Sequence, residues 1–262
     1  MQVSIYSIAF MALSSVVSAG MPVALFIVLQ KKYNAKILPA LTGAAAFVIF
    51  ALVLEQIVHY IVFKKIALRD KQIIYIIYGI LMAGIFEETA RFVSFKILRK
   101  KKYCGISTGL LYGVGHGGTE AVLLAGVSMI AAIVISVLYN TGNLEAIRGK
   151  LQKETFTYIE TQVSTILAAS PFMFLVSGIE RIFAISIQMS LSVVVFYSVY
   201  CRGKMWLFPL AIFLHAFIDI PAAAMQAGIL KSVFFTEGLV GLFAVIMIIY
   251  AVYLHKKLRE ML

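Results

Sequence analysis

Hydrophobic residues in this chain gather into long runs that are separated by short polar or basic intervals. A transmembrane helix needs about 20 mostly apolar residues to cross the hydrocarbon core of a bilayer. Runs of that length lie at about 4–29, 38–63, 73–98, 106–139, 180–201, 206–227 and 233–254. The pattern therefore predicts an all-α, polytopic transmembrane helix bundle with seven spans.

A further apolar run at 161–178 is shorter and contains Pro171. Such a segment is compatible with an eighth span, a re-entrant piece or an interfacial helix, so seven or eight spans are expected. The longest polar interval, 140–160, has the charge pattern of an exposed amphipathic helix. Because no soluble domain or internal repeat is visible, residues 1–262 are expected to form a single integral membrane domain.

The composition supports a membrane protein rather than a nucleic-acid-binding one. Of the 262 residues, 62% are hydrophobic and 13% are charged, and the mean hydropathy is +0.97. Soluble domains carry about 25% charged residues. The net charge of +11 comes largely from short Lys and Arg clusters that flank the spans and are suited to anionic lipid headgroups. We therefore expect a multi-pass protein of a cell membrane, with lipids as partners and no nucleic acid.

The same basic clusters predict the orientation of the chain in the membrane. With seven spans, the clusters at 31–36, 99–102, 202–204 and 256–259 all fall on one face. That face carries more Lys and Arg than the other, so the positive-inside rule makes it cytoplasmic. Cys104 and Cys201 lie at these loop ends, where a reducing compartment suits two thiols that form neither a disulfide framework nor a zinc motif.

One apolar run contains a cluster of charged residues near its middle. Glu87, Glu88 and Arg91 lie within the run 73–98. A charged side chain near the bilayer centre costs at least ~2.5 kcal/mol even on the most lenient insertion scale. Such a cluster is therefore interpreted first as a functional site that faces protein or water.

Ionisable residues inside the spans repeat one spacing. Besides the isolated pair of Glu55 and His59, three pairs are separated by four positions, which places both members of each pair on one face of a helix. One member can then carry out chemistry while the other orients or neutralises it. The pairs are Glu87 and Arg91, His116 and Glu120, and His215 and Asp219.

Depth in the membrane places three of these segments at one level. Glu88 lies eleven residues before Arg99, and His116 lies eleven residues after Gly105. His215 lies eleven residues after Lys204. At 1.5 Å per residue, each side chain lies roughly 16 Å from a basic loop end. If the helices are neighbours, they present a carboxylate and two imidazoles to one point inside the membrane.

A carboxylate and two imidazoles are the groups that a hydrolase needs. A glutamate can take a proton from water and pass it to a leaving amine, while a histidine orients the water or stabilises an oxyanion. No serine or cysteine nucleophile stands at motif spacing from a base, and HExxH is absent from the chain. Two histidines and a carboxylate are also the ligand set of a catalytic zinc site. No cofactor is favoured, and zinc bound by Glu88, His116 and His215 stays open as an alternative.

Other interpretations of the charged residues also stay open. Arg91 and a neighbouring glutamate can form a buried ion pair that only fixes helix packing. The same residues can form a relay in a proton- or cation-coupled membrane transporter. A non-catalytic immunity or binding protein can keep the fold without activity. Glu120, Glu180 and Arg181 are weaker candidates, because Glu180 and Arg181 lie near the end of a run.

Three short motifs resemble a known group of enzymes. Residues 87–91 have the pattern EExxR, residues 112–116 have an aromatic residue followed by His after three positions, and residues 215–219 have HxxxD. In this order they resemble the motifs of the CPBP intramembrane proteases, which include the CAAX prenyl endopeptidases. Phe86-Glu87-Glu88, the segment 113–120 and Glu180-Arg181 are more closely similar to the YhfC family of membrane peptidases. The resemblance covers roughly residues 75–220.

The resemblance implies an intramembrane endopeptidase of the bacterial plasma membrane that acts on a peptide or membrane-protein substrate. The spacing differs from the broad CPBP pattern, which has one more residue before its Arg, and is nearer the EExxK of PrsW-type proteases. Metal-dependent and glutamic mechanisms both belong to this wider group, and the glutamic one is favoured. The resemblance implies that Glu87 or Glu88 activates water, and that His116 and His215 assist it or bind the oxyanion. It also implies that Arg91 orients the glutamates. Asp219 takes the place of the Asn or Asp that follows the histidine of the third motif.

Overall fold

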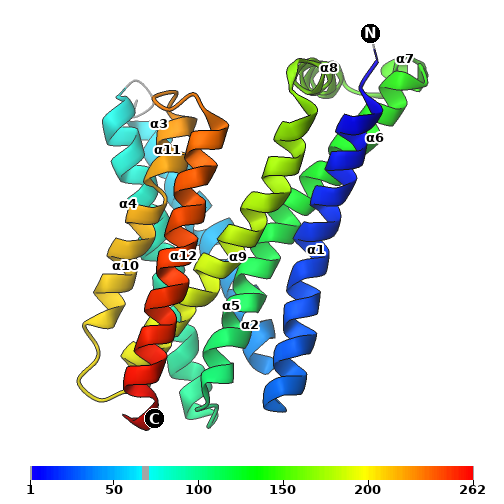
Figure 1. The fold of residues 1–262 in the computed structure, drawn as a ribbon. Coiled ribbons are helices and arrows are strands. Elements are labelled where there is room, and N and C mark those ends of the chain that lie inside the picture. The colour runs from blue at the N-terminus through cyan, green and yellow to red at the C-terminus, as the bar shows by residue number, and fades with distance from the viewer. Residues whose placement is uncertain (1, 67–70, 262) are drawn as a thin grey trace. The chain divides into compact units, whose positions relative to one another are not determined.

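A computed structural model describes residues 2–66 and 71–261, and every regular element in these ranges is helical. This confirms the predicted all-α membrane bundle (Figure 1). Four helices run as single long segments: α1 (Ile5–Tyr33), α4 (Gln72–Lys100), α9 (Pro171–Tyr200) and α12 (Val233–Leu258). The others are interrupted, and the interruptions fall near the polar residues singled out by the sequence.

Two interrupted helices contain a π-helical segment. In the first, α2 (Leu38–Phe47) passes through the π segment η1 (Val48–Glu55) into α3 (Gln56–Lys65). In the second, α5 (Ile106–Glu120) passes through the π segment η3 (Ala121–Gly126) into α6 (Val127–Asn140). One π segment ends at Glu55 and the other begins directly after Glu120. π-Helical turns inside α-helices are frequent at functional sites.

A bend divides the helix that carries the third motif. α10 (Leu207–Ile218) and α11 (Ile220–Gln226) meet at Asp219 with an angle of 40° between them. Pro221 has no N–H to donate to the carbonyl of Phe217, so the helical hydrogen-bond ladder is broken here. Asp219 thus lies at a point where the backbone changes direction.

The described part of the chain holds six helices long and apolar enough to cross a membrane, or seven if the bent α10–α11 pair counts as one span. The eighth span considered at 161–178 is wrong. α8 (Lys153–Ala168) ends before this run does, and α9 begins at Pro171, where the missing proline N–H costs nothing. The polar interval 140–160 is also broken, into α7 (Asn143–Ala146), the 3₁₀ turn η4 (Arg148–Lys150) and the start of α8. The 3₁₀ turn η5 (Arg259–Met261) follows α12.

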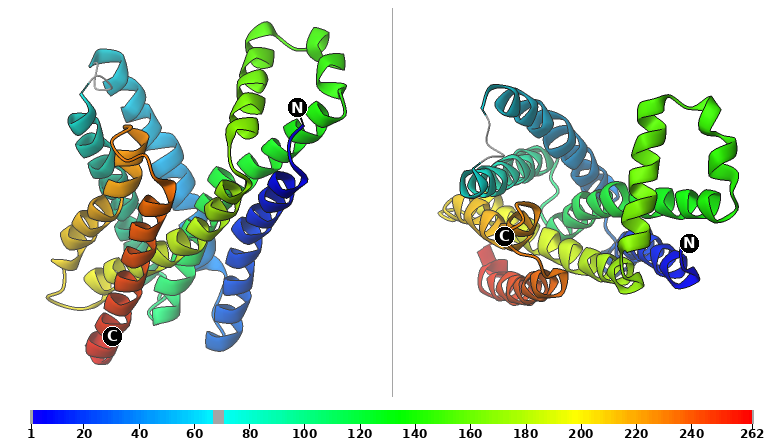
Figure 2. Two further views of the ribbon diagram at one scale, coloured as in Figure 1. Left: turned by 45° about the horizontal axis from the view of Figure 1, so that its top comes forward. Right: turned by 90° about the horizontal axis from the view of Figure 1, so that it is seen from above.

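The chain divides into two compact units: residues Met1–Met21 with Ala121–Ile182, and Pro22–Glu120 with Phe183–Leu262. In the first unit, two hydrogen bonds connect the start of the chain to the end of α6. The Asn140 side chain accepts from Val3 N at 2.8 Å and donates to Val3 O at 2.9 Å. Its cores are small, one formed around Met11 and Ile166 and the other around Leu144 and Phe156. Figure 2 shows α7 and α8 leading the chain away from α6 and back toward α9.

The second unit contains the larger core and all three motif segments. Its hydrophobic cluster centres on residues 187–201, at the end of α9 and directly after it, against which α4, α5, α10 and α12 pack. α2 and α5 approach so closely that their backbones touch. A Cβ at Gly43 would collide with the carbonyl of Tyr112, and a Cβ at Gly115 would collide with the carbonyl of Ala40. Only glycine fits at these crossings, so the glycines around His116 serve helix packing.

Candidate active site

Glu87, Glu88 and Arg91 lie on α4 and are buried inside the second unit. Consecutive residues on an α-helix project about 100° apart. The two glutamates therefore face different neighbours: Glu87 faces α5, and Glu88 faces α10. This divergence gives the two carboxylates different chemical surroundings although they are adjacent in sequence.

Glu87 binds the histidine of the second motif. Its Oε2 atom lies 2.9 Å from His116 Nε2 and accepts a hydrogen bond of 3.0 Å from the Gln188 side chain of α9. His215 Nε2 lies 3.9 Å from the same oxygen. Both imidazoles thus converge on one carboxylate oxygen, which belongs to Glu87 and not to Glu88, the residue used in the depth argument.

Glu88 holds the histidine of the third motif by its other ring nitrogen. His215 Nδ1 lies 2.6 Å from Glu88 Oε1. With Nδ1 occupied by Glu88, Nε2 of the same ring points toward Glu87 and lies 3.5 Å from Asp219 Oδ2. A carboxylate on one ring nitrogen commonly fixes the orientation of a histidine whose other nitrogen does the chemistry. Glu88 therefore orients His215.

Arg91 links both glutamates to α9. Its guanidinium is fully buried and donates to Glu88, to the Gln188 side-chain oxygen and, at 3.3 Å, to Ser192 Oγ. One Nη atom lies 3.6 Å from Glu87 Oε2. A buried arginine charge needs this many partners to offset its desolvation. The i,i+4 pairing of Arg91 with Glu87 predicted from the sequence is present.

The sequence did not reveal Gln188, which joins the site to Glu120. Its amide donates to Glu87 and, at 2.6 Å, to Glu120 Oε2 while its oxygen accepts from Arg91. Glu120 therefore reaches the site through Gln188. The sequence does show an amide side chain within the apolar run 180–201. A neutral amide costs less to insert into a membrane than a charged side chain, so it does not mark a functional site in the same way.

The structure brings together all six residues predicted to be catalytic: Glu87, Glu88, Arg91, His116, His215 and Asp219. Glu180 and Arg181 belong to the first unit, and the carboxylate of Glu180 pairs with the adjacent guanidinium of Arg181.

A second polar cluster lies near the site in the same unit. His59 Nε2 lies 3.3 Å from Glu55 Oε1, and His59 Nδ1 lies 2.8 Å from the Tyr78 hydroxyl. His59, Tyr78 and Asp219 line a cavity of about 390 Å³ between α3, α4 and α11. Along the sequence, Glu55 and His59 form an isolated pair that lies outside the three motif segments.

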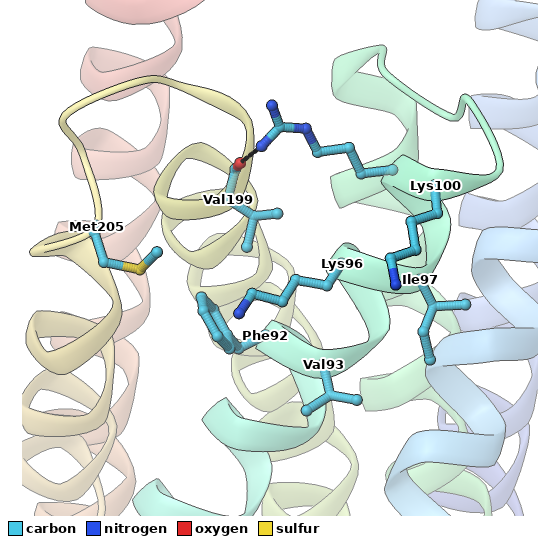
Figure 3. A pocket seen from close by; sticks show the side chains of 8 residues that line it. Phe92, Val93, Lys96, Ile97, Lys100, Val199 and Met205 are labelled. Carbon is cyan, nitrogen blue, oxygen red and sulfur yellow. Dashed lines mark hydrogen bonds between the residues drawn. The ribbon is translucent and has the colours of Figure 1, made fainter.

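A larger cavity lies away from these residues. It measures about 570 Å³ and is bordered by the end of α4 and by Val199 and Met205 (Figure 3). Figure 3 shows the ammonium groups of Lys96 and Lys100 among apolar side chains, and Arg99 donates to the Val199 carbonyl at 2.5 Å. None of the six catalytic candidates lines this space, so its size does not identify it as the active site.

Zinc fits the site by the chemistry of its donors. Two imidazoles and neighbouring carboxylates are the ligand types of catalytic zinc sites. Two buried atoms of the site, Glu88 Oε2 and His116 Nδ1, have no hydrogen-bond partner among the described residues. Within residues 2–66 and 71–261, however, no three His, Cys, Asp or Glu side chains are arranged to hold a metal ion, because the carboxylates and imidazoles bind one another.

Two comparisons of the chain with known proteins found a match, and a third found none. The sequence model of the family described as "YhfC intramembrane metalloprotease" matches residues 17–240. The "Uncharacterized membrane protein YhfC" of Bacillus subtilis (strain 168) is 35% identical over 257 residues, which cover 95% of this chain and 97% of that protein. No solved structure matches. The matched range contains α4, α5, α9 and α10, and thus every residue of the candidate site.

Proposed function

Because the chain belongs to the YhfC intramembrane metalloprotease family, we propose that it is an endopeptidase that hydrolyses a peptide bond of a membrane-associated substrate at Glu87. The observation that carries this proposal is the convergence of His116 Nε2 and His215 Nε2 on Glu87 Oε2. A carboxylate beside two imidazoles in a buried site can move a proton and stabilise developing charge.

Different surroundings support different roles for the two glutamates. The Glu87 side chain is 11% exposed, whereas that of Glu88 is 0% exposed and is held by Arg91 and His215. A general base must reach a water molecule. We therefore assign water activation to Glu87 and the positioning of His215 to Glu88, which separates two roles that the sequence left open.

The proposed reaction uses these residues in two steps. Glu87 takes a proton from water as the water oxygen bonds to the carbonyl carbon of the substrate, which forms a tetrahedral intermediate. Glu87 then passes the proton to the amide nitrogen as the C–N bond breaks and the amine leaves. His215 has carboxylates beside both ring nitrogens and is placed to donate to the oxyanion, while His116 and Arg91 hold Glu87 in position.

The donor types of the same residues also suit a metal ion, although the described side chains bind one another and are not arranged around one. His116 and His215 together with Glu87 or Glu88 would hold zinc, and the chemistry that bound zinc supplies is Lewis acidity and a more acidic water. The residues of the chain keep their tasks of proton transfer and orientation in either case. Metal dependence thus separates the glutamic and the metal-assisted forms of the proposal.

The test is peptide cleavage by purified protein in liposomes. The substrate is a peptide library with a Leu- and Ala-rich transmembrane segment and randomised central positions, and products are identified by mass spectrometry. We expect cleavage by the unmodified protein and a loss of about 10²- to 10⁴-fold in Glu87→Gln and His116→Ala. Glu145→Gln, at an exposed position of the other unit, is the matched control.

Two further readouts complete this test. Loss of activity with 1,10-phenanthroline and recovery with zinc support the metal-assisted form, whereas unchanged activity supports the glutamic form. Equal cleavage by the unmodified protein, Glu87→Gln and His116→Ala would contradict the proposal. Proton flux into the same liposomes without any cleavage would favour the transporter interpretation instead.

A further inference from the structure

The cavity between α3, α4 and α11 extends from the candidate active site toward the end of α4 that begins at Gln72. On α4 its lining runs from Ala83, one helical turn from Glu87, to Tyr75, a span of about 12 Å. Asp219, whose side chain is 35% exposed, lines the cavity and lies beside His215. The cavity and the proposed catalytic groups are therefore continuous.

Polar groups on the cavity wall suit a peptide rather than a lipid tail. The wall includes the carboxylate of Asp219 and the hydroxyl of Tyr78, which is hydrogen-bonded to His59. Gln56 and Gln226 add two amides. A peptide that is unwound inside a membrane needs partners for its N–H and C=O groups, whereas an acyl chain needs none. A volume of about 390 Å³ also falls in the usual range of ligand pockets.

Small residues leave room for a backbone between two walls. Gly79 and Ala83 line the cavity from α4, and Ala222 and Ala223 line it from α11. A Cβ built on Gly79 meets nothing within 4 Å, so the space beside this residue is open. Phe63 and Tyr75 supply aromatic surface for the side chains of a bound peptide.

We propose that this cavity binds the unwound segment of the peptide substrate next to the bond that is cut. The cavity lies in the half of α4 opposite its basic end at Lys100, so the substrate reaches Glu87 from the membrane face opposite the basic loops. This inference rests on the proposed endopeptidase function, and it adds the place where the substrate is held.

The experiment fills the cavity without touching the catalytic groups. Gly79→Leu and Ala223→Leu place bulk on opposite walls, and Gly238→Leu is the matched control because a Cβ there also meets nothing within 4 Å. With the peptide library in liposomes, we expect each cavity variant to raise KM about tenfold or more with kcat nearly unchanged, since it removes binding and not chemistry. Thermal unfolding in detergent should show all three variants folded.

A binding measurement makes the result independent of turnover. In the Glu87→Gln background, crosslinking of a photoreactive Leu- and Ala-rich transmembrane peptide is expected to fall with Gly79→Leu and to persist with Gly238→Leu. If the unmodified protein cleaves the library and the cavity variants match the control, the cavity inference is overturned while the proposed function stands. If nothing is cleaved, the proposed function fails and crosslinking alone decides the cavity. Loss of a co-purified phospholipid with unchanged peptide crosslinking would also overturn the inference.

Discussion

A single side chain, Arg91, determines how the buried charges of the site are arranged. Its planar guanidinium donates from Nε to Ser192 and from its two Nη atoms to Glu88 and Gln188. Lysine has one nitrogen on a flexible stem and cannot reproduce a forked set of donors. The positive charge alone is therefore insufficient at this position.

We predict that Arg91→Lys destabilises the protein although it keeps the charge. Disruption of a buried ion pair costs about 3–5 kcal/mol when one partner is lost, and a partial loss is expected here. The measurement is thermal unfolding in detergent, with Arg99→Lys at the exposed end of the same helix as control. Equal unfolding temperatures for the two variants would show that the forked set of guanidinium donors is unimportant for stability.

The adjacent glutamates lead to a second prediction at this scale. Glu88→Gln should lower kcat about 10- to 100-fold, because residues that orient an active histidine have effects of this size. Glu87→Gln should lower it further, since it removes the proposed base. Steady-state rates on the peptide library give the comparison, and a larger loss in Glu88→Gln would reverse the assigned roles.

Sequence reasoning succeeded with charged residues at this scale and failed with neutral ones. One of the two glutamates was predicted to meet His116 and His215, and Glu87 does. Gln188 was missed because a neutral amide carries no charge to mark it within an apolar run. The relation to CPBP and PrsW-type proteases stays a prediction.

At the scale of helices, close backbone contact between α2 and α5 places His116. Gly43 and Gly115 touch carbonyl groups of the facing helix, so the separation of the two axes depends on both glycines. Hydropathy predicted that these helices exist but could not say which one packs against which. The π segments η1 and η3 were also unpredicted, because an extra residue in a turn leaves an apolar run unchanged.

We predict that Gly115→Ala destabilises the second unit by about 1–3 kcal/mol, since the new methyl group must push the α2 backbone away. His116 is the next residue, so peptide cleavage should also fall. Gly238→Ala provides the control, because its added methyl group meets nothing within 4 Å. Thermal unfolding and library turnover are measured on both variants, and matching values would contradict the packing argument.

For the whole molecule, hydropathy predicted the class but allowed an eighth span that the described residues do not show. It did not predict the division into two compact units. That division falls inside α1, between α5 and η3, and inside α9, where the sequence shows no linker or change in composition. Tertiary contacts define the units, and contacts between distant segments leave no local signal. The cytoplasmic placement of the basic loops stays a prediction.

Cysteine labelling tests this orientation. We expect a membrane-impermeant maleimide to label Cys104, which is exposed, only when it is added from the cytoplasmic side. Cys201 is buried, and burial raises the pKa of its thiol, so less thiolate forms near pH 7.5 and its labelling should be slow until the protein is denatured. Labelling of Cys104 in intact cells from outside would reverse the predicted topology.

The pairing inside α4 also bears on how the protein is made. Gln188 and Ser192 lie 97 and 101 residues after Arg91, so α4 is synthesised long before these partners exist. Arg91 already has Glu87 and Glu88 one turn away on its own helix. The nascent helix can therefore enter the bilayer with most of its charge compensated internally, and the later arrival of α9 and α10 converts this self-paired segment into the site that faces His116 and His215.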